Sequence, residues 1–264
     1  MDWTGPRCLR AAITCLVAAL LLGVAVAPAR ADQAALTPAK DSTLFGFDPD
    51  RSSGAGESLF AGYILLGTPR RALMQFDLSA IPAGASVSAV SLSVVVAQAA
   101  AAATSQTFSL YRLTADWGEG GSDSGFSGAG VQATPGDATW EYRFYGDPQA
   151  GIARTRWTTV GGDFVSAPSS QSGYDGSSTL TFASTATMVA DVQGWLDDPA
   201  SNHGWILLGE NAVLQTALRM VSGNAVVDRP MLTIVYAPVP EPTRALLLLA
   251  GVALLGLAAR RRSR

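Results

Sequence analysis

The fold of this protein can be inferred outward from the run Arg71-Ala-Leu-Met-Gln-Phe-Asp-Leu-Ser-Ala-Ile-Pro-Ala-Gly-Ala85. This run predicts a β-strand over residues 71–78 that ends in the turn-forming run Ile81–Gly84. The alternating apolar residues of Val87–Val96 predict a second strand. Short alternations of this kind, separated by Gly, Ser, Asp and Pro, continue through residues 32–238. The pattern predicts an all-β protein, an antiparallel β-sandwich.

Further strands and loops follow from the same reasoning. Alternation or β-forming composition predicts strands over residues 108–113, 139–145, 205–208, 214–220 and 231–236. Trp140, Tyr142 and Phe144 share one face of the second of these, and we expect that face to be buried. The alanine-rich run 97–103 is predicted to connect two strands. Two glycine-rich stretches, residues 118–136 and 161–176, are predicted to be long surface loops.

One segment, Thr185–Leu196, breaks the β pattern. Its apolar residues recur at helical spacing, Ser184 or Thr185 can cap its start, and Asp197-Asp198-Pro199 ends it. We therefore expect a single amphipathic helix across one end of the sandwich, with Trp195 buried in its apolar stripe.

The N-terminal residues 1–31 have the pattern of a secretory signal peptide. A positively charged start precedes an apolar run over Ala11–Ala27, and Ala29 and Ala31 supply the small residues of a cleavage site before Asp32. The alternative is an uncleaved N-terminal anchor. Both cysteines lie in this segment, so we expect the mature protein to be stabilised by burial rather than by disulfides.

The C-terminal residues 238–264 combine three features in a fixed order. They are the run Val239-Pro240-Glu241-Pro242, the apolar run 245–259, and a basic tail with Arg260, Arg261 and Arg262. A helix of 15 residues rises about 22 Å, and flanking arginines can extend its span toward a ~30 Å hydrocarbon core. We expect a transmembrane helix whose arginines stay in the cytoplasm.

This order of features resembles the PEP-CTERM sorting signal of Gram-negative bacteria that make exopolysaccharide. The resemblance implies that a membrane protease, an exosortase, recognises and cleaves the segment while the precursor is held transiently in the inner membrane. The protein is then expected at the cell surface or in the extracellular matrix. A plain tail anchor is the alternative.

The body of the chain is acidic. Residues 32–238 contain ten Lys and Arg against nineteen Asp and Glu, a net charge of −9. This balance, with scattered cations, argues against nucleic acid and anionic lipid as partners. It also predicts repulsion of a polyanionic polysaccharide unless cations bridge the two.

Blocks spread over this body resemble DNRLRE-domain proteins. The stretch 71–85 is similar to the family's Arg-x-Leu-x-x-Phe-Asp-Leu-Ser and Ile-Pro-x-Gly signature, and the run 214–227 departs from the family's more polar pattern. The other similar blocks follow in the family's order: Leu110–Gly120, Thr139-Trp140, Gly161–Phe164, Asp191–Pro199, Gly204–Glu210 and Arg229–Tyr236. The resemblance implies a jelly-roll-like sandwich related to carbohydrate-binding modules, with a surface or matrix role and polysaccharide binding in some members.

Few residues of the sequence could support catalysis. The single histidine, His203, precedes a predicted strand and is interpreted as a turn residue rather than a general base. Asp116 with Glu119, or Asp197 with Asp198, could form a carboxylate pair for acid–base chemistry. Their turn-like surroundings favour solvated or capping roles instead.

Calcium is the inorganic ligand that the sequence could hold, because hard oxygen donors stand in glycine-rich loops. The candidate ligands are Asp48, Asp50, Asp116, Glu119 and Asp123. Their spacing does not match an EF-hand, and the alternative is that these acids keep a secreted protein soluble. Asp77 differs from them, because we expect it to bond backbone N–H groups in the turn that follows it.

Aromatic rings that stack on sugar faces would give the protein a glycan-binding role. Trp117 and Trp157, in loop-like sequence beside Arg154 and Arg156, are predicted to be exposed, and these four are the candidate glycan contacts. We therefore predict an exported, non-catalytic surface or exopolysaccharide-matrix protein with a structural or glycan-contacting role. The alternatives are a polysaccharide-degrading enzyme that uses loop carboxylates and a protein-binding adhesin.

Overall fold

The computed structural model describes residues 31–46, 48–210, 212–238 and 251. Most of the predicted signal peptide and sorting signal, including Ala29, Val239–Pro242 and Arg260–Arg262, lies outside the described residues. Within the described ranges, no helix is long and apolar enough to cross a lipid bilayer. The described part up to residue 238 is all-β with one α-helix, as the alternation of the strands and the helical spacing of residues 185–196 predict.

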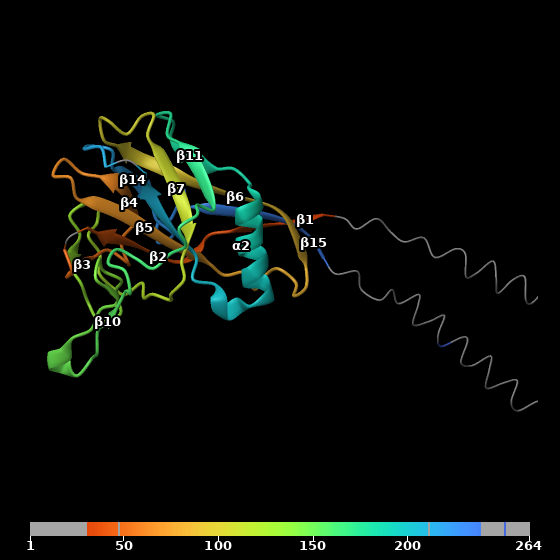
Figure 1. Ribbon diagram of the computed structural model, residues 1–264, viewed down its shortest axis with the longest axis horizontal. Coiled ribbons are helices and arrows are strands. Elements are labelled where there is room, and N and C mark those ends of the chain that lie inside the picture. Colours follow the sequence, from red (N-terminus) through yellow and green to blue (C-terminus); the bar gives the residue numbers. More distant parts are fainter. Residues whose placement is uncertain (1–30, 47, 211, 239–250, 252–264) are drawn as a thin grey trace, which may run out of the picture. The chain divides into compact units, whose positions relative to one another are not determined.

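Eleven strands form one curled antiparallel sheet. They are β1 (Asp32–Leu36), β2 (Pro38–Phe45), β4 (Ser58–Tyr63), β5 (Pro69–Phe76), β6 (Ser86–Ala99), β7 (Thr107–Arg112), β11 (Ser170–Gly173), β12 (Thr179–Phe182), β13 (Trp205–Gly209), β14 (Leu218–Val221) and β15 (Met231–Ala237). The order is β1-β15-β6-β14-β4-β5-β13-β7-β11, with β12 also paired to β6 and β2 to β5 (Figure 1). Two short ribbons pair β3 (Arg51–Ser52) with β8 (Val131–Gln132), and β9 (Tyr142–Phe144) with β10 (Thr155–Arg156).

The main core is built from alternate residues of the long strands. Val90, Leu92 and Val94 of β6 are fully buried, and so are Leu232 and Ile234 of β15, which pairs along β6. This confirms the two faces that alternation predicts for these strands.

The helix α2 (Ala186–Asp197) covers one part of this core and crosses β6 (Figure 1). Thr185 caps its start, because the side-chain oxygen accepts a hydrogen bond from the backbone N–H of Met188 at 3.0 Å. Met188, Val192 and Trp195 form its buried stripe. The predicted helix, its cap and its end at Asp197 are confirmed.

A buried carboxylate ties α2 to the sheet. Asp191 accepts hydrogen bonds from Trp205 Nε1 at 2.9 Å and from Ser169 Oγ at 2.5 Å, and it pairs with Arg112 Nε at 3.1 Å. A cation and two neutral donors compensate the burial of this charge, which would otherwise be costly.

Five predicted boundaries are wrong. The stretch 118–136, expected to be a loop, contains the short strand β8, which pairs with β3. The strand expected over 139–145 is a strand over Tyr142–Phe144, because Thr139 bonds Tyr142 in a local turn instead of a neighbouring strand. The run 97–103 is not all connection, since its first three residues extend β6 beside β14. The stretch 161–176 contains β11, which pairs with β7, and the strand expected from residue 214 begins at residue 218.

Candidate functional site

The long segment between β7 and β11 forms a second layer on the outer face of the sheet. Leu44, Leu73 and Ile206, from β2, β5 and β13, are fully buried on the face opposite the main core. They pack in one apolar cluster with tryptophans of this segment, which are Trp117, Trp140 and Trp157. We call this segment with its apolar cluster the outer layer. In Figure 1, β10 of this segment, and β3, which pairs with β8 of the segment, lie away from α2.

The predicted exposure of Trp117 and Trp157 is wrong. Their side chains are 0% and 4% exposed, because the outer layer needs large apolar residues to form a core of its own. Each indole N–H is paired with a backbone carbonyl: Trp117 Nε1 donates to His203 O at 3.0 Å and Trp157 Nε1 to Thr139 O at 2.9 Å. These rings therefore hold the layer together and present no face to a glycan.

Lys40, the single lysine of the chain, fixes the edge of the outer layer. Its ammonium donates to Asp116 Oδ1 at 2.8 Å and to Trp117 O at 2.6 Å, and lies 4.6 Å from the centroid of the Trp117 ring. Burial acts to raise the pKa of Asp116, but the hydrogen bond and charge of Lys40 outweigh it and the pKa is lowered. Burial lowers the pKa of the nearby His203, which favours its neutral form at pH 7.

Two further carboxyl groups lie beside Lys40. Asp41 is 1% exposed and accepts hydrogen bonds from Ser222 Oγ at 2.8 Å and from the backbone N–H of Gly223. Burial raises its pKa to about 7, and the charge of Glu119 adds to the shift. Glu119 Oε1 accepts from the backbone N–H of Asp41 at 2.9 Å, and burial raises the pKa of Glu119 as well. The structure thus brings His203, Asp116 and Glu119 close to Lys40 and Trp117. The two carboxylates accept hydrogen bonds from Lys40 and from the backbone of Asp41, and the His203 carbonyl accepts one from Trp117.

The five candidate calcium ligands are not brought together. Among the residues that the structure describes, no group of three or more Asp, Glu, His or Cys is arranged to hold a metal ion. Asp48 pairs with Arg51 at 2.9 Å, Asp123 accepts from the backbone N–H of Gly125 at 2.7 Å, and Asp50 lies 3.6 Å from Arg154. Asp116 and Glu119 make the contacts described above. The Asp116, Glu119 and Asp123 group expected from the sequence is therefore not formed, because each acid satisfies a different local partner.

The remaining polar candidates have structural roles. Asp77 Oδ1 accepts from the backbone N–H of Ser79 at 2.9 Å, which confirms the predicted turn. Asp198 Oδ1 accepts from Ala200 N at 3.2 Å at the start of a short 3-10 helix, and Asp197 accepts from Gln193 at 3.0 Å. The pair is thus used for capping and side-chain contacts, as its turn-like sequence suggests.

Arg154 and Arg156 lie at the surface, on a patch that we call the arginine–tyrosine surface, formed with Tyr142 and Tyr145. The Arg154 guanidinium lies 4.3 Å from the Tyr145 ring centroid and donates to its hydroxyl at 2.8 Å. Arg156 lies 4.8 Å from the Tyr142 centroid and donates to its hydroxyl at 3.0 Å. The two arginine side chains are 30% and 61% exposed. Of the four predicted glycan contacts, these two are accessible.

The strand register explains why Arg156 meets Tyr142, whereas Arg154 and Tyr145 stand next to the ends of the two strands. In the β9–β10 ribbon, Arg156 is the partner of Tyr142, and Thr155 is the partner of Phe144. A register shift between Thr155 and Arg156 breaks the alternation in this ribbon, so the local sequence does not indicate the pairing. Sequence reasoning assigned Tyr142 to the core, which its 8% exposure supports, and missed that its ring and hydroxyl support the arginines.

The charge of the arginine–tyrosine surface is locally balanced. Arg156 pairs with Glu141 at 2.5 Å and Arg154 lies 3.6 Å from Asp50, so two cations face two carboxylates. The guanidinium groups provide planar, directional N–H donors, and the paired carboxylates keep the net field small. Such a surface suits a neutral, hydroxyl-rich ligand better than a polyanion.

No protein-family model matches the chain and no curated protein matches it, so the resemblance read from its motifs stays a prediction.

Proposed function

We propose that this is an exported, non-catalytic component of the cell surface or exopolysaccharide matrix, and that it contacts a glycan through the arginine–tyrosine surface. The observation that carries the proposal is the fixed arrangement of Arg154 and Arg156, whose side chains reach the surface, over the buried rings of Tyr142 and Tyr145. The curled antiparallel sheet is compatible with the finer proposal of a jelly-roll-like sandwich related to carbohydrate-binding modules.

The contacts of the acidic residues support a binding role over a catalytic one. Asp116 and Glu119, the carboxylates that an enzyme would use, take part in contacts with Lys40 and the backbone of Asp41. Acid–base chemistry is the alternative, since burial raises the pKa of Glu119 while Lys40 lowers that of Asp116, and carboxyl pairs whose pKa values are pushed apart serve in such reactions. Glu119→Gln tests that alternative: polysaccharide cleavage by the wild type that this variant loses would overturn the non-catalytic proposal.

The proposed location follows from the two ends of the sequence. The N-terminal signal supports export through the inner membrane of a Gram-negative bacterium. The Val-Pro-Glu-Pro run, apolar run and arginine tail support processing by an exosortase after a membrane-anchored stage. The proposed location and the proposed glycan contact are consistent with each other, because both suit a protein of a polysaccharide matrix.

The test is co-sedimentation of the full chain with the exopolysaccharide of the producing bacterium, with calcium and with a chelator. The Arg154→Ala/Arg156→Ala double variant should lose saturable binding. Arg229→Ala, which removes an exposed arginine elsewhere, should retain it. Equal binding by both variants would refute the proposed surface, and loss of binding with chelator would add a cation to the interaction.

A protein-binding adhesin is the second candidate, favoured by exposed apolar side chains at one end of the sheet. Leu66 and Leu214 are 82% and 48% exposed, and their loops meet near Gly67. A protein partner whose capture survives excess polysaccharide and is lost on Leu66→Asp would favour the adhesin over the glycan-contacting protein.

A further inference from the structure

Arg219 of β14 has no polar partner in the part of the chain that the structure describes. Its neighbours Leu218 and Met220 are fully buried in the main core, so the Arg219 side chain lies on the opposite, outer face of the sheet. Within residues 32–46, 48–210 and 212–238, it makes no ion pair and no side-chain hydrogen bond. Its Nε is among the buried atoms without a partner and its Nη atoms are not, so the Nη end of the guanidinium reaches solvent.

The other nine Lys and Arg of residues 32–238 each make a side-chain hydrogen bond or an ion pair. They are Lys40, Arg51, Arg70, Arg71, Arg112, Arg143, Arg154, Arg156 and Arg229. Partial burial of a charge without a partner costs free energy of folding, so Arg219 needs an explanation outside the packed core. A carboxylate from another molecule would supply the missing counter-charge.

Phe126 of the outer layer lies against this guanidinium. Its ring centroid is 5.0 Å from Arg219 Cζ, a cation–π contact. Phe126 is 70% exposed, and among the aromatic residues that the structure describes no other is mostly exposed. A tight turn holds the ring in place, because Ser127 N donates to Ser124 O at 3.0 Å and Ser124 N donates to Ser53 Oγ at 3.2 Å. The ring therefore has a fixed position with apolar surface open to solvent.

Further exposed apolar side chains lie on a loop that is connected to this turn by hydrogen bonds. Ala55 N donates to Ser122 O at 2.8 Å, and Asn224 Nδ2 donates to Gly54 O at 2.7 Å. The loop after β14 carries two valines that are 84% and 66% exposed, Val226 and Val227. Exposed apolar side chains on two joined loops, with a free guanidinium beside one of them, are typical of a surface that binds another molecule.

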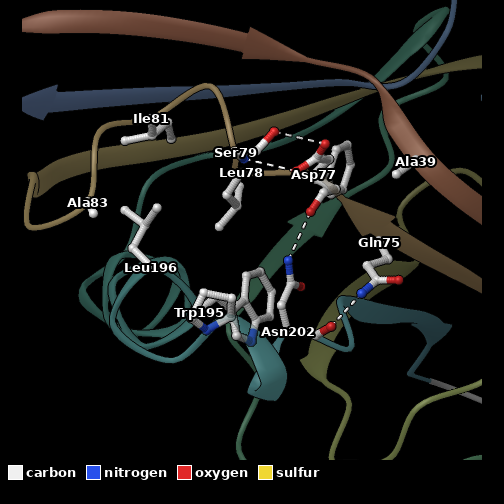
Figure 2. Close-up of a pocket in the computed structure, with 12 residues that line it drawn as sticks. Ala39, Gln75, Asp77, Leu78, Ser79, Ile81, Ala83, Trp195, Leu196 and Asn202 are labelled. Carbon is white, nitrogen blue, oxygen red and sulfur yellow. Dashed lines mark hydrogen bonds between the residues drawn. The ribbon is translucent and has the colours of Figure 1, made fainter.

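The pocket beside α2 offers no comparable group. It has a volume of about 620 Å³ and lies between the end of β5, the turn after it and the C-terminal end of α2 (Figure 2). Asp77, its charged lining residue, accepts from the backbone N–H and the hydroxyl of Ser79. Asn202 Nδ2 donates to Phe76 O at 2.9 Å. These side chains bond to the protein itself, whereas Arg219 is a charge that a partner can pair with.

We propose that Phe126 and Arg219 bind a partner protein through one carboxylate group that apolar side chains flank. The Nη end of the guanidinium can donate two parallel hydrogen bonds to a carboxylate, because both groups are planar. The flanking apolar side chains would cover the exposed surface of the Phe126 ring. Arginines and aromatic residues are also enriched in protein–protein interfaces.

The charge of the chain favours a protein segment over a polyanionic polysaccharide at this surface. Residues 32–238 carry a net charge of −9, and Asp123 of the same loop accepts from Gly125 N instead of pairing with Arg219. A polyanion would extend over these acids and be repelled, whereas a protein segment can bring a single carboxylate. The inference does not depend on the proposed glycan contact, because it uses residues outside the arginine–tyrosine surface.

The direct test is a titration of the full chain, labelled with ¹⁵N-arginine, with the end-blocked peptide Gly-Leu-Glu-Leu-Gly. The Nε–H resonance of Arg219, assigned by its loss in Arg219→Met, should move with saturation. The same peptide with Gln replacing Glu should cause no saturable movement. An equal response to both peptides, or no response to the Glu peptide, would overturn the proposal.

Two variants with matched controls locate the binding surface, and saturation-transfer NMR of the Glu peptide measures its affinity. Arg219→Met should weaken binding about tenfold or more, the loss expected for charge-assisted hydrogen bonds, whereas Arg156→Met, at a 61% exposed arginine, should not. Phe126→Ala should also weaken binding, whereas Ile152→Ala, at a 42% exposed apolar residue, should not. Equal affinity of Arg219→Met and wild type would refute the surface.

The melting temperature of Arg219→Met separates a binding residue from a structural one. Because the guanidinium makes no ion pair or hydrogen bond in the described part of the chain, an apolar side chain of similar length should preserve or raise the melting temperature. A fall of several degrees would assign Arg219 a structural role and overturn the proposal.

The outcomes for this surface and for the proposed function can be told apart. An Arg219 response to the Glu peptide in a protein that binds no polysaccharide would establish the surface and refute the glycan contact. Polysaccharide binding that is lost in Arg154→Ala/Arg156→Ala, with no response of Arg219 to the Glu peptide, would do the reverse. A response of Arg219 to an oligouronate but not to the Glu peptide would overturn the protein partner and assign the surface to an acidic glycan.

Discussion

At the residue scale, Trp117 shows how a ring that looks like a binding residue can be a structural one. It is fully buried, its indole N–H donates to His203 O, and Lys40 lies over its ring. Trp117→Ala should therefore lower the free energy of unfolding by about 3–5 kcal/mol, as other large-to-small aromatic core changes do. Phe126→Ala is the control, because Phe126 is 70% exposed and should change stability little. Similar denaturant midpoints for the two variants would contradict the buried role.

Asp41 makes the stability depend on pH. Because burial raises its pKa to about 7 from an ordinary value of 3.8, the folded protein binds a proton that the unfolded chain releases between these pH values. The free energy of unfolding should therefore fall as pH rises from about 4 to above 7, by a few kcal/mol at most. Urea unfolding at several pH values measures this slope, which Asp41→Asn should flatten. Asp228→Asn, a change at an exposed acid, should preserve it, and an unchanged slope in Asp41→Asn would assign the effect to other groups.

At the element scale, α2 depends on its cap. The Thr185 hydroxyl accepts from Met188 N at 3.0 Å and donates to Ser169 O at 2.5 Å, so it joins the helix to the segment before β11. Thr185→Ala should lower the free energy of unfolding by about 1–2 kcal/mol. Thr187→Ala, at an exposed position of the first turn, should be neutral or slightly stabilising. Thermal unfolding of the two variants checks the difference, and equal melting temperatures would show that the cap does not contribute.

The elements that sequence predicts well are those with one buried face. Alternation locates β6 and β15, and helical spacing locates α2, because each presents a single apolar face to the main core. β2 was missed because its sequence, PAKDSTLF, has Asp41 and Ser42 at buried positions, where contacts distant in sequence satisfy them. No local pattern records such contacts.

The candidate site is predicted only in part, because contacts between residues distant in sequence also decide which of its aromatic residues are buried. The sequence indicates arginines and aromatic residues near each other, but not which of them the outer layer buries. Trp117 and Trp157 are buried because Leu44, Leu73 and Ile206 expose apolar surface on the outer face of the sheet, and something must cover it. This apolar surface forms only when β2, β5 and β13 lie side by side in the folded sheet, so the local sequence does not reveal it.

At the scale of the whole molecule, the outer layer makes the glycine-rich stretch 161–176 part of the fold rather than a free loop. Arg71 donates to Gly161 O at 2.6 Å, Asp163 accepts two backbone N–H groups at 2.8 and 2.6 Å, and β11 pairs with β7. Opening this stretch requires breaking contacts with the sheet itself. Its backbone should consequently resist a protease whose cleavage needs local unfolding.

Limited digestion with proteinase K followed by mass spectrometry tests this expectation. The internal reference is the exposed run Val226–Arg229, where two valine side chains are 84% and 66% exposed. Cleavage should occur there before it occurs within 161–176, and Arg71→Ala should reduce the difference because it removes the bond to Gly161. Early cleavage within 161–176 of the wild type would show that the outer layer opens independently of the sheet. The arginine–tyrosine surface, which the same layer carries, would then be a mobile surface rather than the fixed arrangement on which the proposed glycan contact depends.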